Sequence, residues 1–129
     1  LIVYTLINLK RRQLSIRKLV RCLENSVITT LASLNIHGVA KPGAPGVYID
    51  NQKICSLGLH IQRGCTLHGL ALNVDMDLSP FNLINPCGYA GLTMTQVSAL
   101  SRQFSYSELS HQLVTTFANQ LHYDLVIYT

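Results

Sequence analysis

Cys87 is the residue of this sequence whose surroundings best suit a nucleophile. It lies in the segment Asn85–Tyr89 (NPCGY), where Pro86 restricts the backbone and Gly88 allows a close approach by another group. Loops on a rigid scaffold often carry reactive groups, and a thiol becomes a strong nucleophile when a nearby cation favours the thiolate. A loop cysteine taken alone is more often inert, so the residues around it in the fold decide its role.

Lys53 and His68 are two further residues whose types suit chemistry at a thiol. Lys53 opens the apolar segment KICSLGL directly after a turn. It is either an exposed lysine at the end of a strand or a partly buried one that activates a thiolate or shuttles a proton. His68 shares a predicted strand face with Leu70, Leu72 and Val74. That pattern predicts either a hydrogen-bonded core histidine or a residue that lines a pocket.

Four residues have a spacing that suggests a zinc site, C-x4-H-x4-C-x2-H: Cys55, His60, Cys65 and His68. Structural zinc needs ligands that converge tetrahedrally. Cys55 and His60 are five residues apart on one predicted strand, so their side chains point to opposite faces. We therefore predict cysteines that pack as small apolar side chains, and we expect no metal and no cofactor.

The elements that position these residues follow from the hydrophobic pattern. It predicts strands over residues 1–9, 47–49, 53–61, 66–76 and 123–128, and helices over 16–34 and 106–121. Ser15 is the expected N-cap of the first helix, and Ser105 with Glu108 forms a capping box before the second. Residues 41–46 (KPGAPG) and 78–90 are predicted to be irregular. Since strands and helices do not alternate steadily, we predict an α+β fold with a mixed or antiparallel sheet and flanking helices.

Composition limits the class of protein. A chain of 129 residues, 48% hydrophobic and 12% charged, fits one globular domain and excludes a disordered chain. No apolar run reaches the length of a membrane span, and residues 1–9 lack the flanks of a signal peptide. We therefore expect a cytoplasmic protein with reduced cysteines. Because the chain opens inside a predicted strand and without Met, its N-terminal part is expected to be missing.

The net charge of +4 comes largely from residues in and before the first predicted helix: Lys10, Arg11, Arg12, Arg17, Lys18 and Arg21. Two interpretations are open, a solvated helix face and a docking surface for an acidic protein or nucleic acid. No aromatic residues alternate with these charges, so a platform that stacks single-stranded bases is not expected.

Four segments in a fixed order carry a resemblance: APGVY at 44–48, KICSLGL at 53–59, RGCTLHGLALN at 63–73 and NPCGYAG at 85–91. Together they resemble the octanoyltransferase family, also called lipoate–protein ligase B, over about residues 1–95. The resemblance implies the fold of the catalytic domain of biotin and lipoate protein ligases. Residues 1–129 would then form a single partial catalytic domain.

The resemblance also implies an activity. The family transfers an octanoyl group from acyl carrier protein to a lysine on lipoyl domains of 2-oxoacid dehydrogenase complexes and on the glycine cleavage H protein. It implies that Cys87 is the nucleophile and Lys53 the catalytic lysine. Expected substrate-binding residues are His68, Gly69, Arg63, Gly64, Leu57, Gly58, Ala90 and Gly91. Acyl carrier proteins are acidic, so the resemblance favours the basic residues as a docking surface for acyl carrier protein. Neither nucleic acid nor a membrane is expected as a binding partner.

The sequence departs from the family at its start. The family's Arg-Gly-Gly loop and Thr-Tyr-His-Gly-Pro-Gly-Gln motif do not occur. Strands that pair with residues 1–9 are expected to be missing, which would leave an open sheet edge. Two alternatives remain. An ATP-using lipoate or biotin ligase needs no nucleophilic cysteine, and NPCGY argues against it. An inactive remnant, or a module that binds acyl carrier protein or nucleic acid, is the other.

Overall fold

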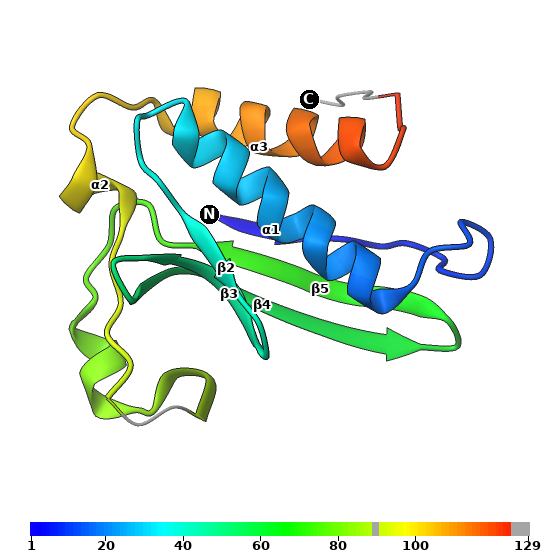
Figure 1. Ribbon diagram of the computed structural model, residues 1–129, viewed down its shortest axis with the longest axis horizontal. Coiled ribbons are helices and arrows are strands. Elements are labelled where there is room, and N and C mark those ends of the chain that lie inside the picture. Colours follow the sequence, from blue (N-terminus) through cyan, green and yellow to red (C-terminus); the bar gives the residue numbers. More distant parts are fainter. Residues whose placement is uncertain (89–90, 125–129) are drawn as a thin grey trace.

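Five strands form one sheet in this protein (Figure 1). The computed structural model describes residues 1–88 and 91–124, and at Cys87 it describes the backbone alone. In the order in which they neighbour one another, the strands are β1 (Ile2–Tyr4), β5 (Cys65–Leu72), β4 (Gln52–Gln62), β3 (Ala44–Ile49) and β2 (Val39–Lys41). Every pairing is antiparallel. The expected α+β class is therefore confirmed, with the antiparallel form of its sheet.

Two helices, α1 (Ile16–Ala32) and α3 (Tyr106–Gln120), lie against one face of the sheet, above it in Figure 1. Both begin at the predicted caps, since Ser15 and Ser105 each accept a backbone N–H from three residues further on, at 3.2 and 3.4 Å. Among the described residues between β5 and α3 there are three short helices: η1 (Ser79–Leu83), η2 (Pro86–Gly88) and α2 (Val97–Leu100). The predicted strand over 123–128 is not seen at residues 123 and 124, and its remainder lies outside the described residues.

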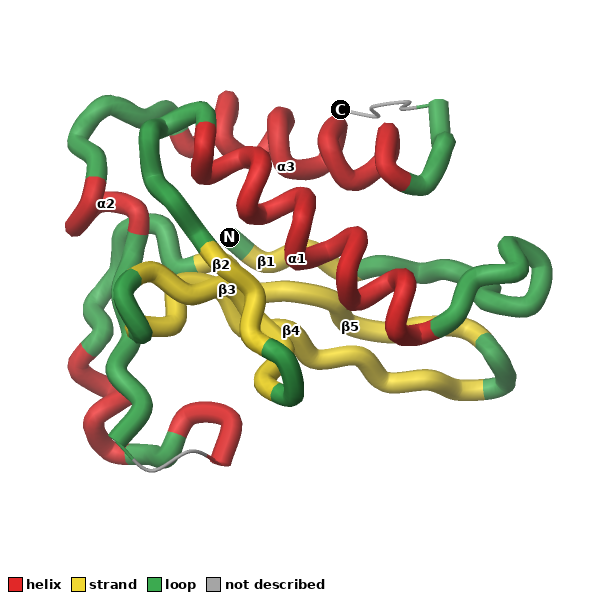
Figure 2. Tube along the Cα trace, viewed as in Figure 1, coloured by secondary structure: helices red, strands yellow, loops and turns green. Residues whose placement is uncertain are grey.

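The segment KPGAPG was predicted to be a loop, and this prediction is wrong. It forms the hairpin between β2 and β3, with only Pro42 and Gly43 in the turn (Figure 2). Gly43 supplies the positive φ of 76° that the turn requires. The ladder shifts register between Ala40 and Lys41, so Pro45 has no paired residue on β2 and its missing N–H costs no hydrogen bond.

Two predicted strands are shorter than expected. The strand predicted over residues 1–9 is regular only at Ile2–Tyr4, although Ile7 still accepts the Thr66 N–H at 2.9 Å. His68 on the neighbouring strand has a φ of 69°, which interrupts the ladder at this point. The strand predicted over 66–76 ends at Leu72, and the next residue, Asn73, accepts the N–H of Val97 at the start of α2.

The strand register separates two faces of the sheet. Val47, Cys55 and Leu72 stand opposite one another and are at most 1% exposed, beneath the apolar side chains of α1. The other face, which we call the open face, is turned away from the helices. It carries Gly46, Tyr48, Lys53, Ser56, Gly58, His60, His68, Gly69 and Ala71. The segment between β5 and α2 descends past the sheet and reaches below this face in Figure 2.

Candidate active site on the open face

Lys53 is the most deeply buried charged side chain of the described residues, with 1% of its surface exposed. A register shift between Val47 and Tyr48 makes Ile54 an extra residue on β4, so Lys53 pairs with Tyr48 while Cys55 pairs with Val47. The shift turns Lys53 onto the open face, where its Nζ lies 5.3 Å from the centroid of the Tyr48 ring. Of the two interpretations of this lysine, the structure therefore favours the buried one.

The backbone of Lys53 holds the segment that carries Cys87. Its N–H donates to Thr93 O at 2.9 Å, and its carbonyl accepts the Thr95 N–H at 3.0 Å. Residues 93–95 thus take the place beside β4 that β5 leaves when it ends at Leu72. Cys87 lies in η2, six residues before Thr93, so its Cα is within roughly 20 Å of this anchor even with the chain fully extended. The backbone of Lys53 is therefore linked to the chain that follows η2, and the pairing of Lys53 with Cys87 stays a prediction.

Two of the other cysteines, Cys55 and Cys22, have surroundings that disfavour a thiolate. Cys55 is fully buried on the helix side of the sheet, and burial raises the pKa of its thiol to about 12 although the charge of Lys53 opposes the shift. Burial also raises the pKa of Cys22, partly offset by Lys18. Cys65 is exposed, at the far end of β5. Cys55 and Cys22 therefore remain thiols at neutral pH.

His68 was predicted as either a core histidine or a pocket residue, and the core alternative is wrong. Strict alternation would place it beside Leu70 and Leu72 under the helices. Its left-handed backbone turns it onto the open face instead, where it is exposed. Its ring lies 5.6 Å from the ring of Tyr4 and 6.5 Å from that of His60, measured between centroids.

A shallow groove of about 390 Å³ runs across β1, β5 and β4 on the open face. Four of the predicted substrate-binding residues line it: Leu57, Gly58, His68 and Gly69. Sequence reasoning missed its other residues: Ile2, Tyr4, Ser56, Leu70 and Ala71. Alternation from Gly58 and Gly69 would have pointed to Ser56 and Ala71, which stand opposite each other in the ladder. The groove is apolar enough for a short acyl chain.

The remaining predicted binding residues lie elsewhere. Arg63 and Gly64 form the turn between β4 and β5, with φ of 51° and 80°, and they do not line the groove. Gly91 has a φ of 75° and lies in the segment that follows η2. Ala90 lies outside the described residues. Lys53 and the groove therefore share the open face of the sheet, and the position of the Cys87 side chain relative to them stays a prediction.

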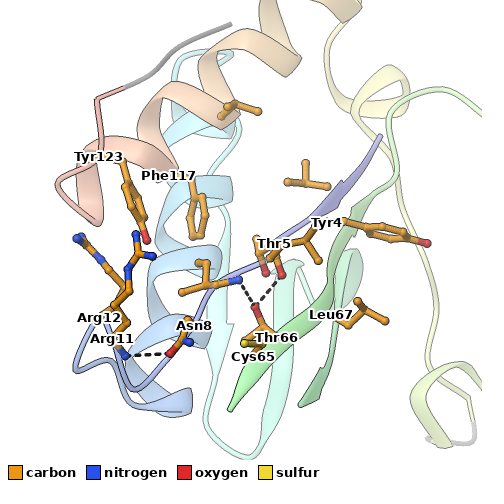
Figure 3. Close-up of a pocket in the computed structure, with 14 residues that line it drawn as sticks. Tyr4, Thr5, Asn8, Arg11, Arg12, Cys65, Thr66, Leu67, Phe117 and Tyr123 are labelled. Atoms are coloured by element: carbon orange, nitrogen blue, oxygen red, sulfur yellow. Dashed lines mark hydrogen bonds between the residues drawn. The ribbon is translucent and has the colours of Figure 1, made fainter. Parts of the chain in front are cut away.

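A larger cavity of about 780 Å³ lies between the outer edge of β1 and α3 (Figure 3). Thr66 links the two sides of its lining: its hydroxyl accepts the Ile7 N–H at 3.0 Å and donates to Thr5 O at 2.7 Å. Among the residues that line it are Cys65, Phe117 and Tyr123, but neither Lys53 nor His68. The Cys65 thiol therefore has neither the predicted catalytic lysine nor the predicted pocket histidine beside it in this lining.

One interpretation of the six basic residues from Lys10 to Arg21 was a solvated helix face. The structure places only three of them on α1. Lys10, Arg11 and Arg12 precede the helix, and Arg12 is tied to the end of α3. Its Nη2 donates to Leu121 O at 2.6 Å, and its guanidinium lies 4.2 Å from the centroid of the Tyr123 ring. Three basic side chains on α1 remain exposed: Arg17, Lys18 and Arg21.

The described part of the chain contains neither a group of side chains that could hold a metal ion nor a helix that could span a membrane. Cys55 faces the helices whereas His60 is exposed on the open face, and no three His, Cys, Asp or Glu side chains among the described residues are grouped to hold a metal ion. None of the described helices is long and apolar enough to cross a membrane.

Comparison with known proteins agrees with this geometry. The family model for the lipoyl protein ligase A/B catalytic domain matches residues 1–118. This chain belongs to that family. The resemblance to octanoyltransferases is also confirmed: octanoyltransferases of Yersinia pestis (strain Pestoides F) and Yersinia pseudotuberculosis (serotype O:1b) are each 55% identical to it over 122 residues. The match covers 95% of this chain and 52% of each relative, so the chain spans about half the length of these curated relatives.

Solved structures of lipoyl and biotin ligases confirm the fold of this family member. The biotin protein ligase of Aquifex aeolicus in complex with biotin and ATP has a TM-score of 0.74 at 16% identity, over 92% of this chain and 48% of that one. A lipoate-protein ligase A bound with ATP has a TM-score of 0.68 at 17% identity, over 87% of this chain and 49% of that one. At these identities the likeness concerns the fold alone.

Gly69 is a position where this lipoyl ligase fold should not tolerate a side chain. A Cβ there would collide with the carbonyl oxygen of Val3 on the neighbouring strand. We expect Gly69→Ala to lower the free energy of unfolding by about 3 kcal/mol, because β1 must move away from β5. Denaturant unfolding measures this change.

Gly58 is the matched control, since it pairs with Gly69 and a Cβ there would meet no atom within 4 Å. Gly58→Ala is expected to change the free energy of unfolding by less than about 0.5 kcal/mol. Equal destabilisation by the two substitutions would contradict the close approach of β1 to Gly69.

Proposed function

We propose that this chain carries the catalytic machinery of an octanoyltransferase, in which Cys87 accepts an octanoyl group and passes it to a lysine of a lipoyl domain. The observation that carries the proposal is the arrangement around Lys53. A buried lysine on the open face is hydrogen-bonded through its backbone to the segment that bears Cys87. A buried ammonium of this kind favours a thiolate beside it.

The first half-reaction would be a thioester exchange. The Cys87 thiolate attacks the carbonyl carbon of the octanoyl thioester on acyl carrier protein, the new carbon–sulfur bond forms and the bond to the carrier's sulfur breaks. The leaving thiolate takes up a proton, for which Lys53 is the donor. One thioester replaces another, so this step is nearly balanced in free energy and needs no nucleotide.

The second half-reaction would form an amide. The neutral amine of the acceptor lysine attacks the acyl-Cys87 carbonyl carbon, the bond to the Cys87 sulfur breaks, and the proton lost by the amine passes to the Lys53 amine, which the first half-reaction left neutral. The ammonium restored in this way would stabilise the departing Cys87 thiolate. The acceptors we propose are the lipoyl domains of 2-oxoacid dehydrogenase complexes and the glycine cleavage H protein, as for the family.

The groove on the open face would hold the acyl chain. Its lining includes Gly58, where a Cβ would meet no atom within 4 Å, so this position leaves room for a chain to lie across β4 and β5. Each methylene buried there contributes roughly 0.8 kcal/mol, enough to favour one chain length over a shorter one. Arg17, Lys18 and Arg21 would attract the acidic carrier protein.

The test is to trap the acyl-enzyme. The folded chain is incubated with octanoyl-acyl carrier protein, and peptide mass spectrometry locates the octanoyl group among the four cysteines. The proposal predicts an octanoyl thioester on Cys87 that hydroxylamine removes. A folded protein with no adduct, or with the adduct on another cysteine, would overturn it. ATP-dependent transfer of free octanoate would replace it with a ligase activity.

A further inference from the structure

Glu24 is a carboxylate in an unusual position, on the buried side of α1. It is 7% exposed and lies between Leu23 and Val27, both fully buried. Its Oε1 accepts the backbone N–H of Gly46 on β3 at 3.0 Å, which links the helix layer to the sheet. Burying a carboxylate is costly unless it is hydrogen-bonded. The hydrogen bond from Gly46 offsets part of this cost, and the role of Glu24 therefore depends on what that bond does for Gly46.

The irregular ladder around β3 makes the Gly46 N–H available to Glu24. The register shift between Ala40 and Lys41 leaves Gly46 without a paired residue on β2. A buried N–H that lacks a strand partner must find another acceptor, and Glu24 supplies it. Gly46 also has a φ of 139°, a backbone conformation that L side chains rarely adopt. The carboxylate therefore holds a glycine whose conformation the strand alone does not fix.

Lys53 lies against the same glycine. A Cβ at Gly46 would stand 2.7 Å from Lys53 Cε, 3.3 Å from its Nζ and 2.6 Å from the carbonyl oxygen of Cys55. The Lys53 side chain thus occupies the space that Gly46 leaves empty, next to the Tyr48 ring. Any rotation of the Gly46 peptide would move the surface on which the lysine rests.

We propose that Glu24 is a positioning residue, which fixes Gly46 so that the Lys53 side chain is held on the open face beside Tyr48. The acceptor oxygen does this, so an amide at position 24 should serve nearly as well as a carboxylate. The inference deepens the proposed function, since the consequence for catalysis rests on it. The placement of Lys53 itself can be tested without any acyl transfer.

The test is an NMR signature of Lys53. Protons within a few ångströms of an aromatic ring are displaced by its ring current, so the Lys53 Hε resonances should differ from those of the exposed lysines, with Lys53→Met identifying them. We expect Glu24→Ala to move these resonances most of the way to exposed-lysine values. In Glu24→Gln the Lys53 Hε resonances should stay close to their positions in the unaltered protein, with a displacement that is a small fraction of the one in Glu24→Ala. An unchanged Lys53 signature in folded Glu24→Ala would overturn the inference.

A matched control separates positioning from a general loss of packing. Val27→Ala removes buried apolar contacts from the same side of α1, three residues after Glu24, and removes no hydrogen-bond acceptor. It should lower the melting temperature yet leave the Lys53 resonances in place, and an equal displacement in Val27→Ala would also overturn the inference. If no acyl-enzyme forms while these resonances respond as expected, the proposed function fails and the role of Glu24 in placing Lys53 stands.

Discussion

Cys87→Ser is expected to abolish the octanoyl adduct and to lower acyl transfer by roughly 10³-fold or more. A serine hydroxyl is not ionised near neutral pH, so the side chain loses the anion that attacks the thioester. The backbone of η2 should be unaffected, because Gly88 N–H still donates to Asn85 O at 2.9 Å. Intact-protein mass after incubation with octanoyl-acyl carrier protein measures the adduct, and transfer to a lipoyl domain measures turnover.

Cys65→Ser is the control for this substitution. Cys65 is an exposed thiol at the end of β5, outside the groove on the open face. Its replacement should leave both readouts at the level of the unaltered chain. Cys55 serves as an internal reference, since a thiol with a pKa of about 12 stays protonated and unreactive throughout the assay. An octanoyl adduct that survives Cys87→Ser would contradict the assignment of the nucleophile.

Lys53→Met is expected to slow acyl transfer by about 10²-fold, because methionine fills much the same space but carries no charge and no N–H donor. In the proposed mechanism the ammonium of Lys53 favours the thiolate of Cys87. Its removal should therefore shift the pH profile of Cys87 alkylation to higher pH, with slower alkylation at neutral pH.

Lys41→Met is the matched control for the loss of a lysine beside the same ring. Lys41 Nζ lies 4.6 Å from the centroid of the Tyr48 ring and donates to Asn51 Oδ1 at 2.8 Å. It is partly exposed on β2 and should leave the alkylation profile unchanged. If Lys53→Met also leaves that profile unchanged, Lys53 does not act on the nucleophile.

The sequence predicted the elements of this fold better than the faces of its strands. Helix caps at Ser15 and Ser105 depend on a few neighbouring residues, and so does the turn at Asp50 and Asn51, whose φ of 45° and 71° suit a tight hairpin. The face on which Lys53 lies depends on a register shift between β3 and β4. Period-two alternation misses such a shift, because it is set by the partner strand.

His68 and Glu24 show the same limit in different ways. Alternation placed His68 in the core, but its left-handed backbone turns it outward. Glu24 lies inside the apolar stripe of α1, three residues before Val27, and a carboxylate there was a signal that sequence reasoning passed over. Its partner, the Gly46 N–H, is available only because the β2–β3 ladder is irregular. Both roles require knowledge of which strand pairs with which.

The strand order implies a sequence of events in folding. Strands β2 to β5 are joined as successive hairpins, so each pairing closes a short loop. The pairing of β1 with β5 joins residues such as Ile2 and Ala71 and closes a far longer loop, which costs more chain entropy. The hairpins and α1 should therefore assemble first, and β1 should dock last. The groove would be completed only at that final step, since Ile2 and Tyr4 form one of its walls.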